Sequence, residues 1–150
     1  IRNLIQRAAI NLGVGQVAFE TAVEYTKIRR QGGVNIIEHQ AIGKMIADMA
    51  IKLEHARAMI WKVAWLTDNP SDISGGEIPL APLHIVASSF TAEAIHDVTH
   101  LAAECFGAMA VMRDMPLQKY VEDASIFLNS DTNDLSTKLR ITEAIIEYQR

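Results

Sequence analysis

Apolar residues recur at three- and four-residue steps through most of this 150-residue chain, and no other feature constrains its fold as strongly. Leu4, Ala8 and Leu12 begin the first such series. These steps match the period of an α-helix with one apolar face, whereas no segment alternates with the period of two that indicates a strand. We therefore predict helices over residues 2–30, 38–67, 83–106, 116–128 and 130–148.

Breaks in the pattern indicate where the chain turns. Gly32 and Gly33 follow the first predicted helix, whose last turn carries Arg29 and Arg30, cations that suit the negative end of a helix dipole. Residues 68–76 are rich in Asp, Ser, Gly and Pro and predict a loop. Long helices joined by short connections predict an all-α fold, an up-and-down four-helix bundle with an additional short helix.

Composition and charge exclude several kinds of partner. With 14 basic and 18 acidic residues the net charge is −4, so we expect no binding of nucleic acid, and no apolar stretch reaches the ~20 residues of a membrane helix. The single cysteine, Cys105, forms no intramolecular disulfide and favours a reducing, cytoplasmic setting. Because residue 1 is Ile, we expect residues 1–150 to be one domain of a longer protein.

The apolar faces are broader than one bundle hides, notably around Trp61, Trp65 and the methionines. Such surfaces are typical of subunit contacts, so we expect self-association into a homodimer or homotetramer.

Two pairs of residues invite a chemical interpretation. His96 and His100 have the i, i+4 spacing of metal ligands, but no glutamate lies between them and no third ligand is near in sequence; surface histidines are favoured, and we predict no metal site. Arg29 and Arg30 are either solvated partners of the helix dipole or a clamp for a diphosphate. Cys105 has apolar neighbours and is interpreted as a packing residue.

Residues 25–40 resemble a signature of the C-terminal helical domain of acyl-CoA dehydrogenases, Tyr…Arg-x-x-Phe-Gly…(His/Glu)-x-Gln. Residues 105–107, 115–117 and 123–124 resemble the glycine turn, the proline segment and the Arg-Asp-Ala that follow in that family. The resemblance covers the whole chain and the last third of a full enzyme. It implies an amino-terminal helical domain and a middle β domain in the parent protein.

The resemblance implies roles for single positions. Arg29 matches the arginine that contacts the FAD pyrophosphate of a neighbouring subunit, and Gln40 matches a glutamine near the same cofactor. Gly107 matches the first glycine of the turn beneath the adenosine, and Thr132 the threonine after the catalytic glutamate. Glu104 occupies a cofactor-binding position where the family usually has Gln, and there it would direct a negative charge at the diphosphate.

The position of the catalytic glutamate departs from the family. Ser130 occupies it in one register and Asp131 in the other; an aspartate can act as a base, whereas a serine cannot. Capping of the last helix is the favoured role for Asp131. The alternative base position, on the first helix, corresponds to Asn3, and Gly32 replaces the customary Phe.

The resemblance implies that the parent protein dehydrogenates acyl-CoA thioesters at the α,β bond, with FAD as cofactor and an electron acceptor as partner. This chain alone is expected to be inactive and to supply oligomer contacts and part of the flavin site. The alternative is a non-catalytic oligomerisation or interaction bundle that has lost the catalytic carboxylate, an idea that Ser130 and Glu104 motivate.

Overall fold

Five α-helices make up most of residues 2–72, 80–129 and 135–146, the part of the chain that this computed structural model describes. The helices are α1 (Arg2–Ile28), α2 (Gln40–Asp68), α3 (Leu80–Phe106), α4 (Leu117–Leu128) and α5 (Leu135–Ile145). Short 3-10 helices follow at η1 (Ile36–Glu38), η2 (Pro70–Asp72) and η3 (Gly107–Val111). The two-residue strands β1 (Arg30–Gln31) and β2 (Val34–Asn35) lie between α1 and η1.

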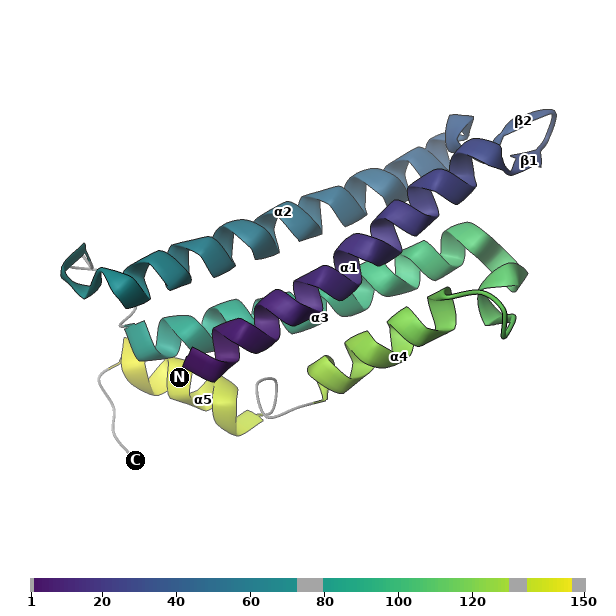
Figure 1. Cartoon of the computed structure of the whole chain (residues 1–150). Helices are drawn as coiled ribbons and strands as arrows, with labels where there is room; N and C mark the ends of the chain where they lie inside the picture. The colour runs from purple at the N-terminus through teal and green to yellow at the C-terminus, as the bar shows by residue number, and fades with distance from the viewer. Residues whose placement is uncertain (1, 73–79, 130–134, 147–150) are drawn as a thin grey trace.

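The three long helices and α4 form an up-and-down bundle (Figure 1). α1 and α3 run in the same direction, and α2 and α4 run in the opposite direction. α4 lies alongside α3, and α5 lies at the end of the bundle where α3 begins. The most extensive packing joins α1 to α3. The predicted all-α bundle with an additional short helix is confirmed.

Small residues on α1 allow the central helices to approach closely. Ala18 and Ala22 are fully buried in the main core, and a Cβ placed on Gly15 would lie 2.6 Å from Ile95 Cδ1 and 3.1 Å from Leu53 Cδ2. Glycine at this position therefore sets the separation of α1 from both α3 and α2.

The prediction that strands are absent is wrong at one place, because β1 and β2 pair antiparallel directly after α1. Gly32 and Gly33 form the turn with φ of +64° and +87°, and two positive φ angles are the requirement of a two-residue type I′ hairpin. The Arg30 guanidinium donates to Gly33 O at 2.6 Å and closes the turn. Strands of two residues are too short to produce a visible alternation.

Several predicted boundaries move by a few residues. α1 ends at Ile28 rather than at residue 30, and α3 begins at Leu80 rather than at residue 83. The predicted start of the last helix, at residue 130, lies outside the described residues. Trp61, which belongs to the apolar surface expected to exceed what one bundle hides, is 68% exposed; it is offset from buried Ile60 by one residue. Within the described residues, no helix has the length and hydrophobicity to cross a membrane.

Candidate functional site

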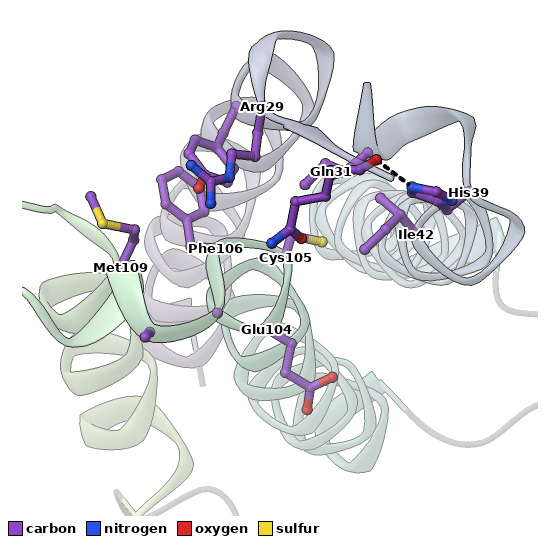
Figure 2. Close-up of a pocket in the computed structure, with 12 residues that line it drawn as sticks. Arg29, Gln31, His39, Ile42, Glu104, Cys105, Phe106 and Met109 are labelled. Atoms are coloured by element: carbon purple, nitrogen blue, oxygen red, sulfur yellow. Dashed lines mark hydrogen bonds between the residues drawn. The ribbon is translucent and has the colours of Figure 1, made fainter. Parts of the chain in front are cut away.

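A cleft of about 570 Å³ opens at the end of the bundle where α1 and α3 end and α2 begins (Figure 2). One wall comes from the ends of α1 and α3 with η3, and the other from the hairpin and the start of α2. The lining residues are Tyr25, Arg29, Gln31, Ile36, His39, Ile42, Glu104, Cys105, Phe106, Gly107, Ala108 and Met109.

Arg29 is held in place by its own backbone. Its N–H donates to Tyr25 O at 2.9 Å, and its carbonyl accepts from Ile36 N–H at 2.8 Å, so the peptide groups before and after Arg29 are both fixed where the helix meets the hairpin. The side chain is exposed and lines the cleft beside the rings of Tyr25 and Phe106, which stack at a centroid distance of 3.9 Å. A planar guanidinium at the mouth of a cleft is suited to bidentate binding of a phosphate.

The hairpin brings two more polar residues to the cleft. His39 Nε2 lies 3.1 Å from Gln31 O; because a carbonyl only accepts, this nitrogen carries the proton. The bond ties the hairpin to the residue that precedes α2. Figure 2 shows the Gln31 side chain extending from the hairpin across the cleft, toward the end of α3. Sequence reasoning missed both residues as cleft-lining groups.

The end of α3 supplies the floor of the cleft. Gly107 has φ of +58°, the left-handed conformation that commonly ends a helix, and it leaves the backbone uncovered by a side chain. Glu104 also lines the cleft, but in Figure 2 its carboxylate points away from Arg29. The structure thus places Glu104 at the cleft, and its role toward a phosphate stays a prediction.

Cys105 lies between Glu104 and Gly107 in the sequence and is 4% exposed. Burial, reinforced by the negative charge of Glu104, raises the pKa of its thiol to about 11. The thiol stays protonated at neutral pH and is a poor nucleophile, which agrees with the packing role expected for it. The Arg29 guanidinium, the Gln31 amide and the Gly107 backbone thus line the same cleft as the Glu104 carboxylate.

The predicted site residues fall into three groups. Arg29, Glu104 and Gly107 lie together in the cleft. Gln40 is exposed at the first residue of α2 and is not among the lining residues; the glutamine in the cleft is Gln31. Residues 130–132 lie outside the described residues, so the roles of Ser130 or Asp131 as the base and of Thr132 near the cofactor stay predictions.

A family model for the C-terminal domain of acyl-CoA dehydrogenases matches residues 4–128. The chain belongs to the acyl-CoA dehydrogenase family. Over 120 residues it is 40% identical to a 3-sulfinopropanoyl-CoA desulfinase of Paraburkholderia xenovorans, covering 80% of this chain and 29% of the relative. It is 35% identical over 115 residues to the mitochondrial short-chain specific acyl-CoA dehydrogenase of Sus scrofa, covering 77% and 26%.

Solved structures of the acyl-CoA dehydrogenase family share this fold. Butyryl-CoA dehydrogenase from Megasphaera elsdenii superposes with a TM-score of 0.83 at 26% identity, over 96% of this chain and 36% of that one. A structure described as an electron transferring flavoprotein of Acidaminococcus fermentans gives a TM-score of 0.85 at 29% identity, over 95% and 36%. The chain thus spans about a third or less of the proteins that it matches.

Proposed function

We propose that the whole protein is an FAD-dependent oxidoreductase of acyl-CoA thioesters, and that this domain holds the diphosphate side of the flavin site. The observation that carries the proposal is the cleft in which Arg29 and Gly107 lie together. In the family motif these positions bind the FAD pyrophosphate and lie beneath its adenosine. Family membership supports the same cofactor, because the relatives include acyl-CoA dehydrogenases.

The residues present fit a nucleotide diphosphate. Arg29 offers paired N–H donors, and Gly107 has no side chain to obstruct a ligand that lies against the backbone. The carboxylate of Glu104 points away from Arg29, so the unfavourable charge is not aimed at a phosphate on that side. FAD, when bound, would supply the acceptor for a hydride from the substrate. In this domain the residues' task is to bind and orient.

We propose a homodimer or homotetramer as the working form, because the family's arginine contacts a cofactor held by a neighbouring subunit. The outward face of α2 supports self-association, since Ile51, Trp61 and Trp65 are 55%, 68% and 61% exposed. Sedimentation of the chain at micromolar concentration tests this proposal. A dimer or tetramer is expected, with Trp61→Ser weakening it, and a clean monomer would contradict it.

We propose Asp131 as the catalytic base; in the alternative register Ser130 occupies that position. In the full-length protein Asp131→Asn should abolish exchange of the substrate α-proton with solvent, and retained exchange would remove Asp131 from the mechanism. The chain alone should show no dehydrogenase turnover. Reduction of an electron acceptor by this chain with acyl-CoA would overturn that part of the proposal.

The full-length protein, expressed in a reducing cytoplasm, tests the function most broadly. We expect it to purify yellow with bound flavin and to lose the oxidised flavin absorbance when a saturated acyl-CoA is added without an acceptor. A stable oligomer that purifies colourless, and stays so after incubation with FAD, would instead favour a non-catalytic oligomerisation bundle.

A second candidate reaction is removal of a sulfinate group from an acyl-CoA. It is favoured by the names of relatives at 40% and 36% identity, 3-sulfinopropanoyl-CoA desulfinases, and by the serine that occupies the base position in one register. Release of sulfite from 3-sulfinopropanoyl-CoA by the full-length protein, with no flavin reduction by butyryl-CoA, would support this reaction. The opposite pattern would support dehydrogenation.

A further inference from the structure

The two histidines at i and i+4 on α3 lie closer to a chelating arrangement than their spacing alone indicates. The ring centroids of His96 and His100 are 4.2 Å apart, with the ring planes tilted by 43°. With metal–nitrogen bonds of about 2.0–2.1 Å, two imidazoles at adjacent positions of one metal ion have centroids about 4.5–5 Å apart. The observed separation is thus less than about 1 Å below the range of a chelating pair.

The neutral His100 ring has a tautomer in which Nε2 is available to a metal ion. Its Nδ1 lies 2.8 Å from His96 O, and since a carbonyl only accepts, Nδ1 carries the proton and Nε2 of the neutral ring keeps its lone pair. Donation of the second ring N–H to a backbone carbonyl is the arrangement that fixes metal-bound histidines in proteins.

The surroundings leave this pair open on one side. His100 is exposed and His96 is half-buried. An open hollow of about 540 Å³ lies against α3 beside His96; its lining residues are Glu93, His96, Asp97, Leu128 and Asn129, and His100 is not one of them. Both carboxylates are already paired, Asp97 with Lys52 at 2.8 Å and Glu93 with Lys138 at 2.7 Å. Within the described residues no three or more His, Cys, Asp or Glu side chains are grouped so as to hold a metal, so the donors here are the two imidazoles.

We propose that His96 and His100 form an open two-nitrogen chelate for a divalent transition metal ion, with water in the remaining positions. Imidazole nitrogens suit Cu²⁺, Ni²⁺ and Zn²⁺, and the expected order of affinity puts Cu²⁺ first. Mg²⁺ prefers oxygen ligands and should not bind there. The sequence favoured surface histidines because it shows neither the distance between the rings nor the tautomer.

Neither histidine lines the cleft that contains Arg29, although His100 lies one helical turn before Glu104 on α3. The chelate thus does not depend on the proposed flavin function, and either can fail alone.

His55 provides a matched control. It is exposed on α2, and its Nδ1 lies 2.7 Å from Ile51 O, so its tautomer and its backbone partner one turn earlier are those of His100. It has no second imidazole one turn away, because Ile51 and Met59 occupy positions i−4 and i+4.

The test is calorimetric titration of the untagged chain with Ni²⁺, repeated with Mg²⁺. We expect a saturable one-to-one binding event with Ni²⁺ and none with Mg²⁺. His96→Gln and His100→Gln should each abolish that event, whereas His55→Gln should leave it unchanged. Circular dichroism confirms that each variant is folded.

Three results would overturn the proposal. They are no saturable Ni²⁺ binding by the unmutated chain, Ni²⁺ binding that survives either His96→Gln or His100→Gln, and loss of Ni²⁺ binding in His55→Gln. When His96→Gln and His100→Gln are both folded, each possible outcome thus supports or contradicts the chelate.

Discussion

The rings of Tyr25 and Phe106 stack with their centroids 3.9 Å apart and their planes within 14°. Tyr25 lies in the last turn of α1 and Phe106 is the last residue of α3, so the contact joins two helices at the point where the chain presents Arg29 to the cleft. Tyr25 begins the first part of the family signature, and Phe106 lies in the second. The stack thus holds the ends of α1 and α3 together beside Arg29.

Replacing Phe106 with Ala should lower the free energy of unfolding by about 3–5 kcal/mol, because the buried ring and its stacking are both lost. Phe106 is 7% exposed. Phe90, on the same helix, is 41% exposed and serves as the control, with a clearly smaller loss expected for Phe90→Ala. Urea denaturation measures both values. Equal losses would show that the stacked ring contributes no more than a half-exposed one.

Two glycines of α1 should respond oppositely to alanine. Gly13→Ala should raise the free energy of unfolding by about 0.5–1 kcal/mol, since nothing lies within 4 Å of the new Cβ and alanine favours the helix. Gly15→Ala should lower it by about 1 kcal/mol or more, because the new Cβ meets both Ile95 and Leu53. Thermal and urea denaturation of the two variants check this. A stabilising Gly15→Ala would mean that α1 and α3 separate without cost.

Cys105 should react slowly with iodoacetamide in the native chain. At pH 8, a thiol pKa of about 11 instead of 9.0 leaves roughly one hundredth as much thiolate, so the native rate should be at least about a hundredfold below that of the urea-unfolded chain. The unfolded rate should level off above pH 9, whereas the native rate should still rise toward pH 11. Comparable native and unfolded rates at pH 8 would contradict this environment.

The same shift predicts how stability depends on pH. The folded chain favours the protonated thiol, because its pKa is raised above the unfolded value. The stability from this group is therefore present below about pH 9 and is lost as pH rises through about 11. In urea denaturation between pH 8 and pH 11, the free energy of unfolding of Cys105→Ala should decline less steeply with pH than that of the unmutated chain. Parallel declines would assign the loss to other groups.

Much of the fold could be predicted from the sequence, because buried apolar residues of a helix recur with its own period. Ala8, Leu53 and Ile95 are such residues, and all are buried. Periodicity does not fix which of two neighbouring apolar positions is buried: Ile60 is buried, whereas Trp61 is exposed. The hairpin was missed because its two-residue strands carry no pattern. The signal for it was the Gly32-Gly33 pair, and glycines also end a helix.

The candidate site was predictable only in part. Arg29 and Gly107 match a motif, and the structure brings them into one cleft. Gln31 and His39 reach the same cleft because a turn brings residues eight positions apart into contact, which no linear spacing reveals. For Glu104 the sequence gives the charge but not its direction, and only the coordinates show the carboxylate turned away from Arg29.

The most direct test of the central claim, that Arg29 binds a nucleotide diphosphate, is calorimetric titration of this chain with ADP. Arg30 is the matched control: it is the adjacent arginine, it is equally a cation, but its guanidinium is bound to Gly33 O and it does not line the cleft. We predict that Arg29→Ala weakens ADP binding by about tenfold or more, the loss of a charge-assisted hydrogen bond, and that Arg30→Ala changes it little. Equal affinities of the parent chain and the folded Arg29→Ala variant for ADP would contradict the account.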